Sequence, residues 1–100
     1  MPAMQASEVV TALAQLPGWQ LHGQGETLAL EKSWRFAHPA QAVLFVNAVS
    51  WLAESMNHHP ELVLQHACCV VRWRTHDVKG LSALDFEAAS RTDELSGASA

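Results

Sequence analysis

The chain has 100 residues, of which 49% are hydrophobic and 16% are charged, and this apolar content is enough to build one buried core. An intrinsically disordered chain is excluded, because such chains lack apolar residues. Six Lys and Arg stand against ten Asp and Glu, and the formal net charge of -4 opposes binding to nucleic acid phosphates and to anionic lipid. We therefore expect one domain over residues 1–100 and no nucleic acid partner.

The sequence predicts neither export nor membrane insertion. Its N-terminal segment has no Lys or Arg, unlike a secretory signal. Residues 36–53 carry no formal charge, but a helix that begins at Pro39 is too short to cross a bilayer before Glu54. The adjacent Cys68 and Cys69 would point to opposite faces of a strand and cannot easily bond to each other. We expect a cytoplasmic protein with reduced thiols and no membrane partner.

Apolar periodicity predicts an N-terminal helix followed by a hairpin. Residues 7–16 place Val and Leu at helical spacing, and a Pro-Gly pair then ends the helix. Residues 19–22 and 27–36 are extended runs around a Gly-rich turn at 23–26. In the second run an apolar set, Leu28, Leu30, Trp34 and Phe36, alternates with a set expected to face water, Ala29, Glu31, Ser33 and Arg35.

A long central helix is predicted from Pro39 to about Asn57, because proline suits a first helical turn and Pro60 prevents continuation. Its polar residues form one narrow stripe: Asn47, Ser50, Glu54 and Asn57. The rest of this helix is so apolar that we expect it to be packed nearly all round. The tryptophans are also expected in the core: Trp19, Trp34, Trp51 and Trp73.

A second hairpin and a last helix complete the pattern. Residues 62–64 and 68–76 are predicted strands around a turn at 65–67, with Cys69, Val71 and Trp73 facing the core and Val70, Arg72 and Arg74 facing solvent. Ser82 and Asp85 have the spacing of a capping box, which predicts a helix over 82–95 and a frayed tail over 96–100. The order α-β-β-α-β-β-α predicts an α+β domain, with a four-stranded antiparallel sheet and all helices on one face.

Histidines carry most of the functional information in this sequence. Three of the six, His58, His59 and His76, lie near predicted element boundaries, where functional sites often collect. Glu54 precedes His58 by four residues, so both would share a helix face and the carboxylate could fix the imidazole tautomer. Asp85 follows His76 across a glycine turn and could return to the same cleft.

Less specific interpretations remain open for these residues. Histidines at a helix end also interact favourably with the helix dipole, and Asp85 alone is explained as a capping carboxylate. The other histidines are expected at surface or turn positions: His22, His38 and His66. Adjacent histidines diverge on a helix and no Cys-x-x-Cys accompanies them, so we expect no metal. The cysteines lie in mid-strand, where no helix N-terminus would activate a thiol.

Read together, these motifs resemble the pterin-4a-carbinolamine dehydratase family. The matching residues are Glu54, the His-His-Pro-Glu at 58–61, Thr75 with His76, and the Gly-Leu-Ser-x-x-Asp at 80–85. The resemblance extends over residues 19–95. The sequence departs from the family pattern at Leu62 and His66, where aromatic residues are usual, and at Ala88, where a larger aliphatic residue is common.

The resemblance implies an enzyme that removes water from 4a-hydroxytetrahydropterin and forms quinonoid dihydropterin. This step recycles the cofactor of aromatic amino acid hydroxylases, which makes such a hydroxylase the expected functional partner. No cofactor is implied, because the pterin is the substrate. Contact with the substrate is expected from His59, Thr75 and Asp85.

The resemblance also implies roles for the histidines and carboxylates. Imidazole titrates near neutral pH and can act either as acid or as base. We expect His58, His59 and His76 to be catalytic, with His58 and His76 transferring the protons and His59 holding the pterin. Glu54 and Asp85 would orient imidazoles, Asp85 that of His76.

Two further implications concern partners. Some family members act as dimerisation cofactors of transcription factors, so a protein-binding module is the alternative function, and an apolar patch on an exposed helix would favour it. An inactive scaffold is a third interpretation, which the complete set of motif residues opposes. A homodimer or homotetramer is expected, in which paired sheet edges would cover exposed strand N–H and C=O groups.

Overall fold

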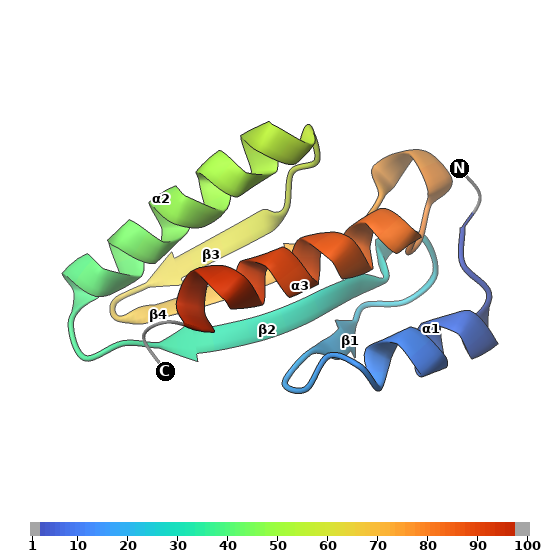
Figure 1. The fold of residues 1–100 in the computed structure, drawn as a ribbon, viewed down its shortest axis with the longest axis horizontal. Helices are drawn as coiled ribbons and strands as arrows, with labels where there is room; N and C mark the ends of the chain where they lie inside the picture. Colours follow the sequence, from blue (N-terminus) through green and yellow to red (C-terminus); the bar gives the residue numbers. More distant parts are fainter. Residues whose placement is uncertain (1–2, 98–100) are drawn as a thin grey trace.

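Residues 3–97, the part of the chain that the computed structural model describes, form three α-helices and a four-stranded sheet (Figure 1). In chain order the elements are α1 (Ala6–Leu13), β1 (Gln20–His22), η1 (Gly25–Thr27), β2 (Ala29–Arg35), α2 (Pro39–Met56), β3 (Glu61–Gln65), β4 (Cys68–Trp73), η2 (His76–Val78) and α3 (Ala83–Gly97). The two η elements are single 3₁₀ turns.

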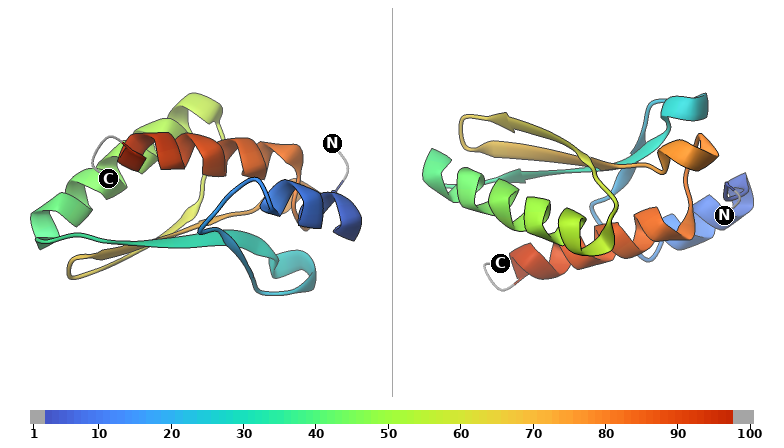
Figure 2. Two further views of the ribbon diagram at one scale, coloured as in Figure 1. Left: turned by 60° about the horizontal axis from the view of Figure 1, so that its bottom comes forward. Right: turned by 90° about the horizontal axis from the view of Figure 1, so that it is seen from above.

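The sheet joins two hairpins through their inner strands. Its strand order is β1-β2-β4-β3, and every neighbouring pair is antiparallel. The central β2–β4 pair places Leu30 opposite Trp73 and Trp34 opposite Cys69. The helices lie over one face of this sheet, as Figure 2 shows from two further directions. The predicted fold class, strand count and placement of the helices are confirmed.

The core lies between that face and the helices α2 and α3. Leu30, Val71 and Trp73 are fully buried, as strand alternation predicted. On α3, Ala88 and Ala89 are also fully buried, so the small side chains face the core. Ala29 is an exception to the alternation, because it belongs to the set expected to face water and is only 2% exposed.

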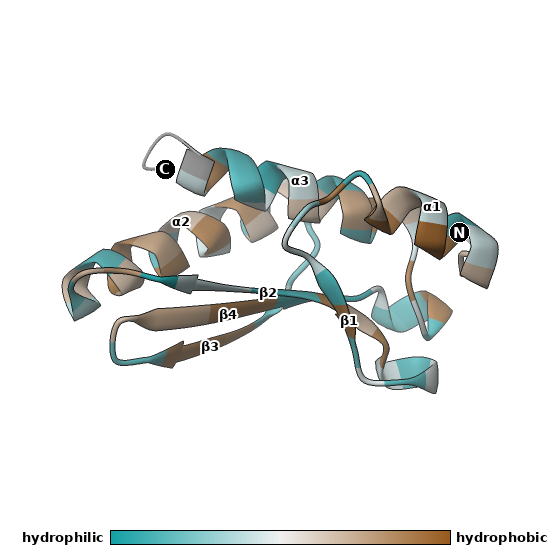
Figure 3. Ribbon diagram, turned by 90° about the horizontal axis from the view of Figure 1, so that it is seen from below, coloured by the Kyte–Doolittle hydropathy of each residue, from teal (hydrophilic) through white to brown (hydrophobic). Residues whose placement is uncertain are grey.

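The central helix differs from its prediction. Only one stripe of α2 is buried, formed by Ala42, Phe45, Val49 and Ala53. Leu44 is 68% exposed and Trp51 is 77% exposed, so it is wrong that this helix is packed nearly all round and that Trp51 lies in the core. Among residues 3–97 no second layer covers the outer face of α2, and the ribbon of this helix is coloured brown along much of its length in Figure 3. No helix in this part of the chain is long and apolar enough to cross a membrane.

The ends of several elements also differ from prediction. The last strand stops at Trp73 instead of continuing to residue 76, because Thr75 pairs only with Gly80 in an isolated bridge and the chain turns through η2 between them. His76 therefore lies on a 3₁₀ turn and not on a strand. At the C-terminus, α3 extends to Gly97, so the first part of the predicted tail is helical. The rest of that tail, residues 98–100, lies outside the described residues.

Candidate active site

The end of α2 sets the positions of His58 and His59. Asn57 adopts a left-handed conformation with φ of 51°, which asparagine tolerates better than most residues. The N–H of His58 then donates to the carbonyl of Ala53 at 3.1 Å, a bond that closes the helix C-terminus. Because the helix ends here, the two imidazoles are not arranged as on a helix, and their surroundings differ.

His58 is held inside the domain. Its Nε2 lies 2.7 Å from Oδ1 of Asp85, and its ring stacks on Trp73 with centroids 5.4 Å apart. The His58 side chain is 10% exposed and that of Asp85 is fully buried. No buried side-chain nitrogen or oxygen among residues 3–97 lacks a hydrogen-bond partner, so the second ring nitrogen of His58 reaches solvent.

Asp85 collects three hydrogen bonds. Besides His58, its Oδ2 accepts from the hydroxyl of Thr75 at 2.7 Å and from the N–H of Ser82 at 3.0 Å. The Ser82 hydroxyl lies 2.7 Å from that of Thr75. The carboxylate half of the predicted capping box is thus present, while the serine hydroxyl bonds to Thr75. Thr75 and Ser82 both donate to Oδ2, and an ionised carboxylate can only accept, so the contact at Oδ1 favours the His58 tautomer with the proton on Nε2.

Two predicted contacts are corrected by this geometry. Asp85 bonds to His58 and not to His76. Glu54 does not share a helix face with His58, because the helix has ended, and its Oε1 lies instead 3.3 Å from Nε2 of His59. Both members of this second pair are largely exposed.

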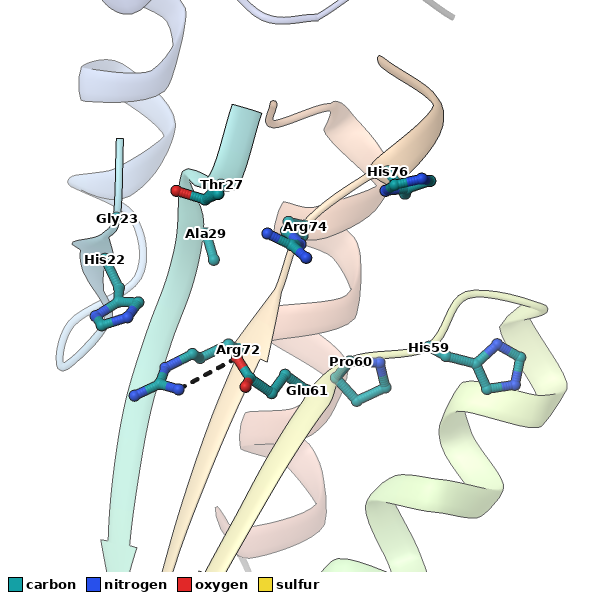
Figure 4. Close-up of a pocket in the computed structure, with 10 residues that line it drawn as sticks. All are labelled: His22, Gly23, Thr27, Ala29, His59, Pro60, Glu61, Arg72, Arg74 and His76. Carbon is teal, nitrogen blue, oxygen red and sulfur yellow. Dashed lines mark hydrogen bonds and ion pairs between the residues drawn. The ribbon is translucent and has the colours of Figure 1, made fainter. Parts of the chain in front are cut away.

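A cavity of about 380 Å³ opens beside these residues (Figure 4). It is lined by His22, Gly23, Thr27, Ala29, His59, Pro60, Glu61, Arg72, Arg74 and His76. In Figure 4, His59 lies on the α2 side, His76 lies above it near the end of β4, and His22 lies across the cavity on β1. Of the predicted site residues, His59 and His76 line the cavity. The others, His58, Glu54, Thr75 and Asp85, do not belong to its wall.

Arg72 and Glu61 line the cavity as part of a cluster of charged strand side chains. Arg72 donates from Nε to Glu31 at 2.6 Å and from Nη1 to Glu61 at 3.1 Å. The hydrogen bond from Arg72 holds the pKa of Glu31 below its ordinary value, and the same bond raises the pKa of Arg72. His22 also lies near Glu31, with 3.2 Å between Nδ1 and Oε2.

The sequence did not identify the strand residues of this cavity. His22 was expected at an ordinary surface position, yet it lines the cavity, and Arg72 and Arg74 were expected only to face solvent. Strand alternation placed both arginines on the open face correctly. The strand order brings β1 and η1 beside these arginines. Because strand order is set by tertiary packing, no local sequence signal could have identified all the residues that line the cavity.

This arrangement suits proton transfer to a bound small molecule. His59 and His76 come from separate segments and line one cavity, so a ligand there can exchange protons with both. The Asp85 and Glu54 contacts each fix a ring nitrogen of one imidazole. Within residues 3–97, no group of three or more His, Cys, Asp and Glu is arranged to hold a metal ion.

Comparison with known proteins identifies the family. Residues 2–95 match the family model described as pterin 4 alpha carbinolamine dehydratase. The chain belongs to this family. A protein of Paracidovorax citrulli, provisionally named a pterin-4-alpha-carbinolamine dehydratase, is 48% identical over 97% of this chain and 84% of its own length. A similarly named protein of Paracoccus denitrificans is 40% identical over 96% of this chain and 88% of its own.

Solved structures agree with this family fold. A crystal structure from Brucella melitensis, titled as a transcriptional coactivator/pterin dehydratase, superposes with a TM-score of 0.85 at 29% identity and covers 93% of this chain and 97% of that one. A pterin dehydratase-like protein, titled as a RuBisCO assembly factor in the alpha-carboxysome, gives a TM-score of 0.67 at 22% identity, with 80% of this chain and 90% of that one covered. The second likeness concerns the fold alone.

Proposed function

We propose that this protein removes water from a 4a-hydroxytetrahydropterin and releases quinonoid dihydropterin. The observation that carries the proposal is the position of His59 and His76, two motif histidines from distant segments that line one cavity. Membership of the dehydratase family supports a pterin as the substrate class. The reaction needs no cofactor, because the substrate itself supplies both electrons of the new double bond.

The chemistry requires one acid and one base. The C4a–O bond breaks and a double bond forms between C4a and N5, while a base removes the N5 proton and an acid protonates the departing hydroxyl. One proton is taken up and one is released, so the two imidazoles together end with the same number of protons. His59 and His76 perform these transfers and then exchange protons with water through their exposed sides.

His58 acts differently in this scheme. Its side chain is 10% exposed, its Nε2 is engaged by Asp85, and its ring stacks on Trp73. We assign it a positioning role, in which it supports the loop that carries His59, and Glu54 orients the His59 ring. This division differs from the sequence-based expectation that His58 transfers a proton and His59 only holds the pterin.

A direct assay tests the proposal. The 4a-hydroxytetrahydropterin is generated in solution and the quinonoid product is followed by its absorbance, with and without the protein. We expect His59→Ala and His76→Ala each to lower kcat by roughly 100-fold, the usual contribution of a positioned acid or base. His38→Ala is the matched control, because His38 lies at the far end of α2, outside the cavity wall. A wild-type protein that does not accelerate product formation would refute the proposal.

A protein-binding module is the second candidate function, and the outer face of α2 favours it. Leu44 and Trp51 lie two helical turns apart on the same side of α2 and are both largely exposed. Titles of similar structures name a transcriptional coactivator and a RuBisCO assembly factor, which describe those proteins. Dehydratase activity that persists in a Trp51→Ala variant would show that the reaction in the cavity does not depend on this surface. The dehydratase function proposed above also includes two expectations: an aromatic amino acid hydroxylase supplies the substrate, and the protein is cytoplasmic.

A further inference from the structure

A second, smaller hollow adjoins the cavity on the side of η2. This hollow has a volume of about 160 Å³ and is lined by Glu26, Thr27, Arg74, His76 and Lys79. Thr27, Arg74 and His76 also line the main cavity, so the two spaces meet at these three residues. A group in the smaller hollow would therefore lie next to a ligand in the main cavity, with Arg74 and His76 in contact with both.

The junction of the two hollows carries positive charge that the protein does not neutralise. Arg72 is paired with two carboxylates, but Arg74 has no carboxylate oxygen within 4.0 Å among residues 3–97. Lys79 lies 3.7 Å from Glu26, and both side chains are about 70% exposed, so this ion pair is weak.

The position of these cations is notable because the whole chain is acidic. The formal net charge is -4, and Lys and Arg number only six. Three of those six line the two hollows: Arg72, Arg74 and Lys79. Among these three, Arg74 is the guanidinium left free to bind an anion, and guanidinium groups suit the paired oxygens of carboxylates and phosphates.

We propose that Arg74 and Lys79 form a subsite for an anionic group, a carboxylate or a phosphate, on the 6-substituent of the pterin substrate. This inference rests on the function proposed above, which places the pterin ring beside His59 and His76. The ring occupies the main cavity, and the charged end of the substituent lies in the smaller hollow. The subsite thus favours pterins whose 6-substituent carries a negative charge over pterins with a neutral one.

Binding of three pterins tests the subsite. The dissociation constants of 6-hydroxymethylpterin, its phosphate monoester and pterin-6-carboxylate are measured by pterin fluorescence with the full chain. We expect the wild type to bind an anionic pterin about tenfold more tightly than the neutral one, since an ionic hydrogen bond to arginine is among the strong ones. The preference should weaken as salt concentration rises. Whichever anionic pterin shows the larger gain in affinity over the neutral pterin indicates whether the subsite prefers a carboxylate or a phosphate.

Matched variants locate the effect. Arg74→Gln and Lys79→Gln should each reduce the ratio of anionic to neutral affinity, with Arg74→Gln bringing it close to one. Arg35→Gln is the control and should keep the wild-type ratio. Arg35 also lacks a carboxylate partner among residues 3–97, but it lies at the C-terminal end of β2, whereas Arg74 lies near the N-terminal end of that strand. Equal affinity for neutral and anionic pterins in the wild type, or an unchanged ratio in Arg74→Gln, would overturn the subsite.

The dehydration assay separates failure of the subsite from failure of the proposed function. Dehydration of a substrate with a neutral side chain, together with equal binding of all three pterins, overturns the subsite and leaves the function standing. A clear anion preference without any dehydration overturns the function and supports the subsite. Absence of both binding and dehydration overturns both.

Discussion

Single residues at this site combine contacts that stabilise the fold with contacts to the motif histidines, and Asp85 is the clearest case. Its carboxylate accepts the first N–H of the α3 cap from Ser82, the hydroxyl of Thr75 and a proton of His58. Because the carboxylate is fully buried, leaving it without these partners would be costly. The sequence pattern suggested that Asp85 combines capping with a site role, and the structure shows the capping bond from Ser82 together with a contact to His58.

The first prediction separates the two roles of Asp85. Asp85→Asn keeps one acceptor oxygen but introduces an N–H₂ group, which opposes the protonated Nε2 of His58 and favours the other tautomer. We expect kcat, normalised to folded protein, to fall on the order of tenfold or more, with a changed pH–rate profile. Ser82→Ala is the control and should lower stability by about 1 kcal/mol while leaving that profile unchanged. Equal normalised activity of Asp85→Asn and wild type would reduce Asp85 to a cap.

The second prediction concerns the ion pair of Glu31 and Arg72. The pKa of Glu31 is lowered from its ordinary 4.5, chiefly by the hydrogen bond from Arg72, so the pair stabilises the fold above that pH. This stability is lost as pH falls below 4.5 through the lower folded-state value. Glu31→Gln should therefore be less stable than wild type by about 1 kcal/mol at pH 7, and the difference should shrink toward pH 3. Urea unfolding at several pH values measures it, and a constant difference would contradict the assignment.

At the scale of elements, the ends of helices and strands determine the contacts of the site residues more than the interiors do. The alternation of β4 and the Pro39 start of α2 were predicted well, because side-chain periodicity and proline stereochemistry act locally. The end of α2 was predicted within one residue, yet the carboxylate partners were assigned wrongly, because Glu54 was expected beside His58 and Asp85 beside His76. A single left-handed residue at 57 turns the chain, so i,i+4 spacing from Glu54 no longer describes proximity.

The third prediction tests this turn. Asn57→Ala places a Cβ in left-handed backbone without the local hydrogen bonding that asparagine offers, and should lower the free energy of unfolding by about 1 kcal/mol. Asn57→Gly should be as stable as wild type or more so, because glycine adopts this conformation freely. Asn47→Ala, on an exposed position of the same helix, is the control and should not destabilise the protein. Equal stability of the Ala and Gly variants at 57 would contradict a conformational role.

For the whole molecule, the main observation is that its apolar surface exceeds what one copy can bury. The outer face of α2 exposes Leu44 and Trp51, and the edge strand β3 exposes Leu64, which is 45% accessible. Residues 36–53 have no formal charge, so two copies can bring α2 against α2 without like-charge repulsion despite the net charge of -4. A second copy of this chain is the occupant that these features favour.

The fourth prediction follows from that surface. Sedimentation at micromolar concentration should show a dimer or tetramer of the 10.9 kDa chain. Trp51→Glu should shift the equilibrium toward smaller species, because it places a charge in the centre of the apolar face. His38→Ala, at the start of the same helix, should sediment as wild type does. A monomer alone at these concentrations would contradict the expected oligomer. An oligomer that is unaffected by Trp51→Glu would contradict an interface on the α2 face and favour one at the β3 edge.

The sequence by itself determined the fold class, the order of elements and the motif residues Glu54, His58, His59, His76 and Asp85. These depend on periodicity, on proline and capping chemistry and on motif spacing, all of which are local along the chain. Only the tertiary structure decided which carboxylate meets which imidazole, that His22, Arg72 and Arg74 join the cavity, and that Trp51 faces outward. The physical reason is that these facts depend on strand order, on a left-handed turn and on the number of layers that cover a helix, and each of them is set by packing between segments distant in the sequence.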